Sequence, residues 1–329
     1  MTNKQNDQTF LVTGAMGCLG SWVIRNLVDE GVRVVAADLA TEPTRARLLM
    51  TEEEIAAINW VSLDVTDLAA VENTFADHSI THVVHLAGLQ IPFCKANPSV
   101  GASVNVLGTV NVLEAARQHG VKGVCYASSL AAFGPEENYP DRPIKDDVPL
   151  IPTSLYGVYK AANEGTAKIY WQDWQLGSIG LRPYVVYGVA RDQGLTSDLA
   201  KAILATAAGK PFHIRFDGPL ALQHANDTAQ TFIRSARAEH KGAATCNLRG
   251  DVIEVADFVR VLTSLYPESQ ITFKQNAPLP YPADLDDSGL RRILGELPYT
   301  PLKTAIQQDV ARFRVLLDEG KVDLAQLDK

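Results

Sequence analysis

A glycine-rich turn near the N-terminus constrains the fold of this chain more than any other segment. The apolar run TFLVT leads into Gly14, Gly17 and Gly20, and a helical pattern follows at 21–30. Glycines let a chain turn sharply after a strand, bring backbone close to a ligand and pack a helix tightly on a sheet. Amides at the start of such a helix attract phosphate groups. The segment therefore predicts a strand–turn–helix unit that holds a dinucleotide.

Short runs rich in β-branched residues alternate with helical patterns as far as Gly188. This alternation predicts an α/β fold with a doubly wound parallel sheet. The runs are apolar nearly throughout, as expected for strands covered on both faces. Beyond the first unit we expect strands at 32–38, 58–65, 81–88, 121–129 and 176–188, and helices at 68–78, 105–119 and 154–175.

The second half of the chain has a looser pattern, which predicts a smaller, mostly helical C-terminal cap that binds the substrate. Stretches with proline and glycine separate helical patterns at 196–209, 227–239, 254–266 and 302–318, and 276–289 predicts an irregular connector. The predicted boundaries are 1–188 for the nucleotide-binding domain, with 220–245 rejoining it, and 189–219 and 246–329 for the cap.

Composition excludes several classes of function. The 329 residues carry a net charge of −8 and are 46% hydrophobic, which suits a soluble globular protein but not a nucleic-acid partner. The N-terminus is polar and no apolar run reaches the roughly 18 residues of a membrane helix, so we expect a cytoplasmic protein without a membrane partner. The cysteines predict neither disulfides nor a metal site, because they stand singly at Cys18, Cys94, Cys125 and Cys246.

Asp38 ends the second predicted strand and indicates which dinucleotide binds. A carboxylate there accepts hydrogen bonds from the ribose hydroxyls of NAD and repels the 2′-phosphate of NADP, so NAD is expected. Asp64 and Val65 close the third strand and could flank the adenine, although Asp64 suits a turn or helix-cap position equally well. No metal is expected, because backbone amides suffice to hold the phosphates.

Tyr156 and Lys160 are spaced i, i+4, so their side chains share one face of the predicted helix. A tyrosine has a pKa of about 10, and a nearby ammonium favours its phenolate. Such a tyrosine can take the proton of a secondary alcohol. An ordinary surface pair has the same spacing. Ser128 and Ser129 follow the strand at 121–129, at the edge where ligands bind, and we favour Ser129 as the hydroxyl that holds the substrate oxygen, with strand-end capping as the alternative.

Together these motifs resemble the extended short-chain dehydrogenase/reductase family, also called NAD-dependent epimerase/dehydratases. The resemblance runs from Phe10 to about Ala229 and implies a Rossmann-type fold with NAD as the cofactor. It rests on TGAxGxxG at 13–20, Asp38, Asp64-Val65, HLAG at 85–88, NVLGTVNVLEAAR at 105–117, ASSLAAFG at 127–134, Tyr156/Lys160 and LRPYVVYG at 181–188.

The resemblance also implies roles for particular residues. Ser129, Tyr156 and Lys160 would be catalytic, and Lys160 would also hold the nicotinamide ribose. Asn105 would support the site from behind. The remaining cofactor contacts would be Met16, Gly17, Cys18 and Leu19 at the pyrophosphate, Leu86, Ala87 and Gly88 at the adenosine ribose, and Pro183 with Val185 or Val186 at the nicotinamide. The helices at 105–119 and 154–175 would form a homodimer interface.

Departures from the family pattern narrow the function. Leu130 and Ala131 follow Ser129 where dehydratases carry an acidic pair, so dehydration is not expected. Val185 stands where nucleotide-sugar enzymes have an asparagine, and Leu220 stands where they have an arginine for the diphosphate. The substrate is therefore expected to lack a nucleotide.

Polar residues of the second half, together with Gln90, Ser129 and Tyr156, are candidates for binding a polyhydroxylated substrate, one that could bear a carboxylate. These candidates are Arg191, Thr196, Ser197, His213, Arg215 and His224, each equally compatible with a surface or structural role. PFHIRF alternates like a strand, so His213 and Arg215 share a face.

Three functions fit these observations. The first is an NAD-dependent dehydrogenase that oxidises a secondary alcohol of a small sugar, sugar acid or polyol. The second is an epimerase that uses the same residues and keeps its NAD. The third is a non-catalytic NAD-sensing protein, against which the intact Ser129, Tyr156 and Lys160 argue.

Overall fold

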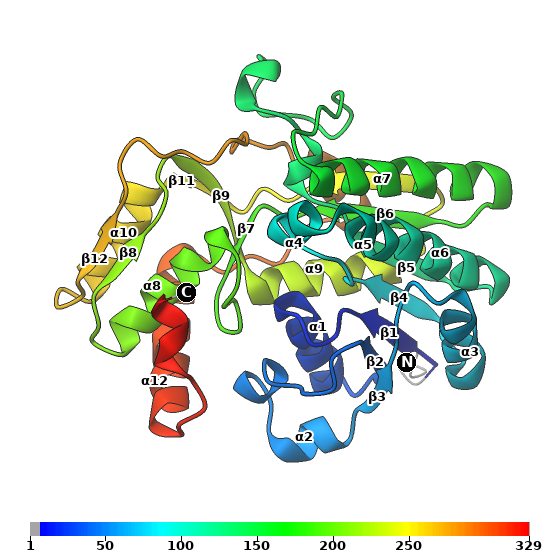
Figure 1. Ribbon diagram of the computed structural model, residues 1–329, viewed down its shortest axis with the longest axis horizontal. Helices are drawn as coiled ribbons and strands as arrows, with labels where there is room; N and C mark the ends of the chain where they lie inside the picture. The colour runs from blue at the N-terminus through cyan, green and yellow to red at the C-terminus, as the bar shows by residue number, and fades with distance from the viewer. Residues whose placement is uncertain (1–6, 329) are drawn as a thin grey trace.

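A seven-stranded parallel sheet forms the centre of the larger part of the molecule (Figure 1). The structure is a computed structural model that describes residues 7–328. The strands lie in the order β10-β6-β5-β4-β1-β2-β3, so the chain reverses direction across the sheet between β1 and β4, as in a doubly wound fold. Their bounds are Thr9–Thr13 (β1), Arg33–Asp38 (β2), Asn59–Ser62 (β3), His82–His85 (β4), Gly123–Ala127 (β5), Ser178–Arg182 (β6) and Ala243–Asn247 (β10). The predicted fold class is confirmed.

Helices cover both faces of this sheet (Figure 1). Successive strand residues point to opposite faces, so Phe10 and Val12 of β1 join one core cluster while Leu11 joins the other. One face is covered by α1 (Cys18–Asp29) and α9 (Ala225–Arg237), and the other by α3 (Leu68–His78), α6 (Gly108–Gln118) and α7 (Leu155–Trp174). Shorter helices are η1 (Ala46–Leu48), α2 (Glu52–Ala56), α4 (Ile91–Ala96), α5 (Pro98–Ala102) and the π-helical turn η2 (Ser103–Leu107).

The smaller part has a core of its own, in which Leu199, Ile203, Phe258 and Phe313 are buried. Its helices are α8 (Asp198–Ala207), α10 (Val255–Leu265) and α12 (Leu302–Asp318), whereas α11 (Ser288–Leu294) packs on β10 and places Leu290 in the core of the large sheet. Two small sheets accompany them: β7 (Val185–Tyr187), β9 (Pro219–His224) and β11 (Asp251–Glu254) pair in one, and β8 (Phe212–Ile214) pairs with β12 (Ile271–Phe273) in the other. The cap therefore contains more strand than the sequence pattern predicts.

Two segments depart from the predicted elements in ways that affect the site. The single strand expected at 176–188 is divided at Pro183 into β6 of the large sheet and β7 of a small one. Segment 220–245 contributes α9, which packs on α1, and most of β9, which pairs with β7 and β11 in the smaller sheet. The predicted boundaries of domain and cap remain a prediction, and their outermost residues, 1–6 and 329, lie outside the described residues. Within 7–328 no helix is long and apolar enough to cross a membrane.

Candidate active site

The glycine turn lies at the carboxyl end of β1, next to the point where the strand order reverses. Gly14 has φ +70°, and a Cβ there would come within 2.7 Å of the backbone of Leu86 and Ala87. A Cβ on Gly20 would collide with the carbonyl oxygen of Gly14. Gly17 is the N-cap of α1 and supplies no side chain to its first amides. This cradle of backbone fits a pyrophosphate, which the open amides can bind.

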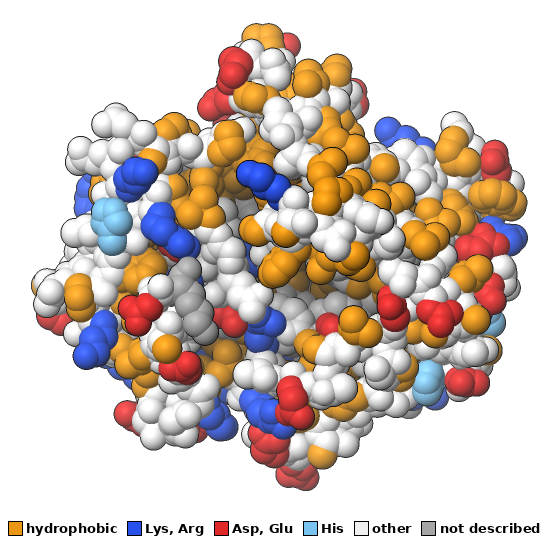
Figure 2. All heavy atoms as spheres, viewed as in Figure 1, with side chains coloured by type: hydrophobic (Ala, Val, Ile, Leu, Met, Phe, Trp, Pro, Cys, Tyr) orange, Lys and Arg blue, Asp and Glu red, His pale blue; other side chains and the backbone are white. Residues whose placement is uncertain are grey.

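Two adjoining cavities, of about 370 Å³ and 240 Å³, extend from this turn in opposite directions. The face of the molecule is hollowed between its two parts (Figure 2). Both cavities are lined by Gly14, Gly17, Cys18, Leu86, Gly88, Gln90 and Arg191. The larger is also lined by Met16, Asp38, Asp64, Val65 and Ala87, and the smaller by Leu19, Gly20, Ser129, Tyr156, Lys160, Pro183 and Val186. The predicted cofactor residues thus follow one continuous groove, apart from Val185, which is buried in the core of the cap.

The two acidic residues at the strand ends lie in the larger cavity. The Asp38 carboxylate accepts hydrogen bonds from the backbone N–H groups of Met16 (2.9 Å) and Ala40 (3.0 Å), which fix its position beside the glycine turn. Asp64 accepts hydrogen bonds from the backbone and hydroxyl of Thr66, at 2.9 and 2.8 Å. Asp64 therefore acts as a turn residue and lines the groove at the same time.

Ser129, Tyr156 and Lys160 meet in the smaller cavity because the start of α7 packs against the turn that follows β5. Ser154 caps α7 by accepting a hydrogen bond from Gly157 N–H (3.1 Å). Ser129 Oγ accepts a hydrogen bond from the backbone N–H of Ala131 (3.1 Å) and lines the same cavity as Tyr156. Lys160 Nζ donates to the carbonyl of Ala127 (2.7 Å) and lies 5.5 Å from the centre of the Tyr156 ring. The arrangement places an acid–base hydroxyl and a second hydroxyl in one cavity.

Burial dominates the electrostatics of this cavity. It raises the pKa of Tyr156 above its usual range, although the Ser129 hydroxyl and the charge of Arg191 act to lower it. Burial also lowers the pKa of Lys160 to about 8. The Lys160 ammonium lies over the Tyr156 ring and is held by the Ala127 carbonyl, and the charge of Arg191 also acts on Tyr156. The expected role of Lys160 in favouring the phenolate stays a prediction.

A buried ion pair that the sequence analysis did not predict lies behind the catalytic turn. Glu164 of α7 and Arg182 of β6 pair through two contacts of 2.7 and 2.9 Å, and their side chains are only 2–3% exposed. Ser128 donates to Glu164 (2.5 Å), so this hydroxyl is engaged in the core while Ser129 lines the cavity with Tyr156. The sequence carried one signal of this ion pair: Arg182 ends the short, buried strand β6, and an arginine is seldom fully buried unless it is paired.

Asn105 lies in the π-helical turn η2, behind the loop that follows β4. The side-chain amide of Asn105 donates hydrogen bonds to the carbonyls of Leu89 (3.2 Å) and Gly101 (3.0 Å). The backbone carbonyl of Asn105 accepts a hydrogen bond from the side chain of Asn163 (2.9 Å). These bonds join the loop, η2 and α7 across the back of the groove, the position that the resemblance implies.

The structure separates the predicted substrate residues into two sets. Gln90 and Arg191 line the groove, and Arg191 Nη2 donates to Thr196 Oγ1 (3.0 Å). Ser197 is fully buried and donates to the Gly194 carbonyl (2.6 Å), which closes the turn before α8.

Three other candidates do not reach the groove. His213 is exposed and hydrogen-bonded to Thr272, and Arg215 pairs with Asp198 (2.7 Å). His224 lies 3.4 Å from Asp309 and lines a separate cavity of about 340 Å³. Their partners come from distant parts of the chain, which is why periodicity alone did not place them.

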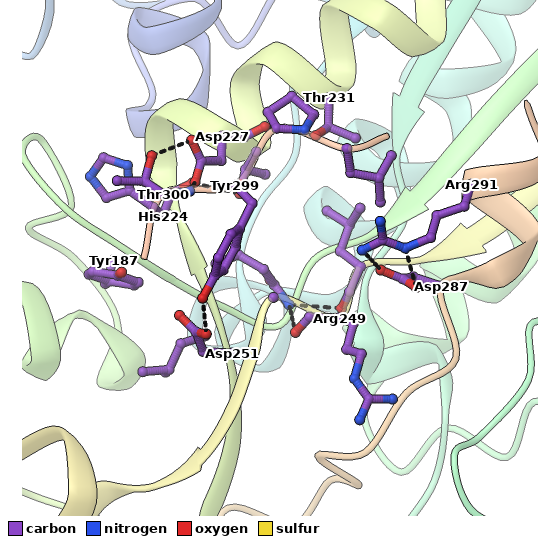
Figure 3. A pocket seen from close by; sticks show the side chains of 17 residues that line it. Tyr187, His224, Asp227, Thr231, Arg249, Asp251, Asp287, Arg291, Tyr299 and Thr300 are labelled. Carbon is purple, nitrogen blue, oxygen red and sulfur yellow. Dashed lines mark hydrogen bonds and ion pairs between the residues drawn. The ribbon is translucent and has the colours of Figure 1, made fainter. Parts of the chain in front are cut away.

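Figure 3 shows this separate cavity, in which the charged groups point at one another. Tyr299 donates to Asp251 (2.8 Å), Arg291 pairs with Asp287 (2.9 Å), and Asp227 accepts a hydrogen bond from the backbone of Thr300 (2.6 Å). The contact between Asp227 and Thr300 joins α9 to the segment before α12, whereas Asp287 and Arg291 pair within one turn of α11.

Positions that distinguish chemistries within the predicted family are apolar and buried. Leu130 and Ala131 are 1% and 4% exposed and offer no acid to the cavity. Val185 and Leu220 are fully buried in the core of the cap and line neither groove cavity. Across the described part of the chain, no cluster of three or more His, Cys, Asp or Glu is suited to a metal ion, and the four cysteines are unpaired.

The chain is similar to proteins of known families. A sequence profile described as the NAD dependent epimerase/dehydratase family matches residues 10–248. UDP-glucose 4-epimerase of Mycolicibacterium smegmatis is 32% identical over 208 residues, which cover 61% of this chain and 65% of that protein. Mitochondrial L-threonine 3-dehydrogenase of Bos taurus is 24% identical over 308 residues, covering 89% and 79%. The match to the epimerase thus spans less than two thirds of that relative.

Solved structures extend the likeness to nearly the whole chain. MoeE5 in complex with UDP-glucose and NAD is 26% identical with a TM-score of 0.77, covering 94% of this chain and 99% of MoeE5. A partial consensus L-threonine 3-dehydrogenase is 23% identical with a TM-score of 0.81, covering 93% and 99%, and shows the same fold. With the glycine turn, the groove and the profile match in agreement, the chain belongs to the NAD-dependent epimerase/dehydratase family.

Proposed function

We propose that this chain is an NAD-dependent oxidoreductase that oxidises a secondary alcohol of a small carbohydrate-like substrate that carries no nucleotide. The observation that carries the proposal is the meeting of Ser129, Tyr156 and Lys160 in a cavity continuous with the glycine groove. NAD, when bound, supplies the acceptor for the hydride that leaves the alcohol carbon.

The residues divide the remaining work. The amides of the glycine turn and the start of α1 bind the pyrophosphate, and Asp38 accepts hydrogen bonds from the adenosine ribose. Ser129 holds the alcohol oxygen, Tyr156 takes its proton, and Lys160 binds the nicotinamide ribose. In the reverse direction Tyr156 returns the proton to the oxygen.

The shape of the site supports a small substrate. The cavity around Tyr156 has a volume of about 240 Å³, which is below the usual range for small-molecule sites. Val185 and Leu220 are part of the core, so neither supplies a polar contact for a sugar diphosphate. A polar molecule of a few carbons suits both observations.

Epimerisation is the second candidate, and the relatives favour it. A UDP-glucose 4-epimerase is 32% identical to part of this chain, and MoeE5 was solved with UDP-glucose and NAD. The same three residues would oxidise the alcohol and then reduce the ketone from its other face. Purified protein that retains NAD tightly, inverts a sugar and releases no net NADH would favour this candidate over the first.

Substitution of Tyr156 tests catalysis directly, and Tyr159 offers a matched control on the same helix. Tyr159 donates a hydrogen bond to the Pro98 carbonyl (2.9 Å) and lines neither groove cavity. Tyr156→Phe should reduce NADH production from a carbohydrate panel at least about 100-fold, because the proton acceptor is lost. NAD binding should persist, and Tyr159→Phe should remain active. Equal turnover by Tyr156→Phe and the wild type would contradict the proposal and revive a non-catalytic NAD-sensing role.

The outward faces of α6 and α7 support a homodimer. Leu107, just before α6, and Val158 and Ile169 of α7 are 45–49% exposed. Figure 2 shows hydrophobic side chains gathered over the region of α4, α5 and α7. Two copies that pair these helices would cover this apolar surface. Four unpaired cysteines suit a reducing, cytoplasmic compartment.

A further inference from the structure

We propose that Arg191 binds a carboxylate of the substrate, so that the alcohol oxidised at Tyr156 belongs to a small hydroxy acid. The inference rests on the proposed function and assigns its substrate class. It is carried by the position of Arg191 in the groove and by a guanidinium that the protein leaves without an anionic partner.

Arg191 occupies the junction of the two groove cavities. It follows β7 on a loop whose next turn, Leu195–Ser197, leads into α8. The bond from Arg191 Nη2 to Thr196 Oγ1 (3.0 Å) anchors one edge of the guanidinium, and Ser197 fixes the turn itself. Gln90 approaches from the loop after β4 and lines both cavities beside Arg191. The guanidinium is therefore held in place at the groove.

The charge of Arg191 has no carboxylate partner among residues 7–328. The neighbouring carboxylate, Asp192, pairs instead with Arg45 (2.8 Å). Arg191 Nε is buried and makes no hydrogen bond within the same residues. The Arg191 side chain is half-buried in the wall of the groove. Because its charge is partly withdrawn from water and is not neutralised by a carboxylate of the described residues, a carboxylate bound in the groove would pair with the guanidinium.

A substrate carboxylate fits Arg191 better than the pyrophosphate does. The open amides of the glycine turn and α1 already suit the pyrophosphate. Arg191 and Tyr156 line the same smaller cavity, and in the proposed function the substrate alcohol lies at Tyr156. The planar guanidinium also binds a carboxylate through two parallel hydrogen bonds. A molecule with an alcohol at Tyr156 and a carboxylate at Arg191 would span a cavity of about 240 Å³.

Matched pairs of acid and neutral alcohol test this assignment. The pairs are gluconate and glucitol, and threonate and threitol, each with NAD and with NADH formation as the readout. In at least one pair the wild type should prefer the acid. Arg191→Met should lower kcat/KM for that acid about 100-fold, the cost of leaving a buried carboxylate unpaired. Turnover of the neutral partner should fall much less than turnover of the acid, so the ratio of the two kcat/KM values should drop.

Two further variants separate charge from fold. Arg191→Lys keeps the charge but loses the paired hydrogen bonds, so its kcat/KM for the acid should lie between those of the wild type and Arg191→Met. Arg142→Met removes an arginine that pairs with Glu136 on an exposed segment, and it should behave as the wild type. Thermal denaturation of the NAD complexes supplies a readout that needs no turnover: the acids should raise Tm in the wild type more than in Arg191→Met, and the neutral partners should raise both equally.

Each result that departs from these expectations rejects a different part of the proposal. Equal kcat/KM and equal Tm shifts for acid and neutral partners in the wild type would overturn the assignment while leaving the oxidoreductase intact. A weaker Kd for NAD in Arg191→Met, with the preference for acid unchanged, would assign Arg191 to the pyrophosphate. Acids that stabilise the protein through Arg191 without any Tyr156-dependent oxidation would sustain the assignment and reject the proposed function instead.

Discussion

Lys160 is the residue whose ionisation bears most directly on the chemistry. Its ammonium is buried beside the Tyr156 ring, and burial lowers its pKa to about 8. In the proposed oxidation Tyr156 must be deprotonated to accept the alcohol proton, while burial raises its pKa above the usual range. Lys160 remains mostly charged at neutral pH and can stabilise the phenolate once the site is closed by ligands. Oxidation should therefore become faster as pH rises through neutrality.

Replacing Lys160 tests that coupling. Lys160→Met removes the positive charge, so the ascending limb of the kcat/KM profile for oxidation should move about one pH unit higher, a fall of about tenfold at pH 7. Lys168→Met, at an exposed position of α7, is the control and should keep the wild-type profile. The test is the pH at which the ascending limb lies. If the substitution only damaged the structure, kcat/KM would fall at every pH and the limb would stay at the same pH. An unmoved limb in Lys160→Met would count against the electrostatic role.

Residues whose role depends on near neighbours in sequence were predictable. Gly14, Gly17 and Gly20 act within one turn, and Tyr156 and Lys160 within one turn of a helix, so spacing alone brought them together. His213 and Arg215 have partners at Thr272 and Asp198, which only the folded cap brings close. Periodicity predicted their common face but could not say which surface that face would meet.

At the scale of elements, the buried pair Glu164–Arg182 joins α7 to β6 behind the catalytic turn. Removing one charge from a buried pair leaves the other unpaired in a place that water does not reach. Glu164→Gln should therefore reduce the free energy of unfolding by about 3 kcal/mol, measured by urea denaturation. The glutamine would still accept the hydrogen bond from Ser128, so the lost free energy of unfolding would come mainly from the missing charge.

An exposed pair provides the comparison. Glu136→Gln, which breaks the contact with Arg142, should cost less than about 1 kcal/mol because water screens that pair. A double variant, Glu164→Leu with Arg182→Met, should be more stable than Glu164→Gln because no uncompensated charge remains. If Glu164→Gln proves no more costly than Glu136→Gln, then the buried pair is not what holds α7 to β6.

The length of an element decided how well the sequence predicted it. α3 and α12 have the bounds that their periodicity predicts, 68–78 and 302–318, because several turns repeat the same apolar face. β8 lies within PFHIRF, whose alternation predicts a strand, whereas its partner β12 has three residues, which are too few to show a period. β10 is partly exposed at the edge of the large sheet and lacks the apolar run of a central strand.

At the scale of the whole molecule, the groove lies where the two cores meet. Trp22 of α1 donates to the Val189 carbonyl (2.9 Å), and Arg312 of α12 donates to the Leu48 carbonyl (2.7 Å), so both sides of the cap are attached to the nucleotide-binding part. The loop that carries Arg191 begins next to the first of these contacts. The position of the proposed carboxylate anchor thus depends on how the cap sits on α1, a relation that no local sequence pattern specifies.

The apolar outer face of α7 permits a test of assembly that leaves the groove untouched. Val158, Ala162, Gly165 and Ile169 lie on one exposed stripe of that helix, and small residues there let a second helix approach closely. The wild type should have twice the chain mass of 35.7 kDa by sedimentation or light scattering.

Val158→Glu with Ile169→Glu should yield a folded monomer, because four carboxylates would be buried against one another in the dimer. Val315→Glu is the matched control: Val315 of α12 is 45% exposed, as is Val158, but it lies on the cap, so this variant should remain dimeric. A monomeric wild type would remove the homodimer from the proposal. A glutamate variant that stays dimeric with an unchanged circular dichroism spectrum would move the interface to another surface.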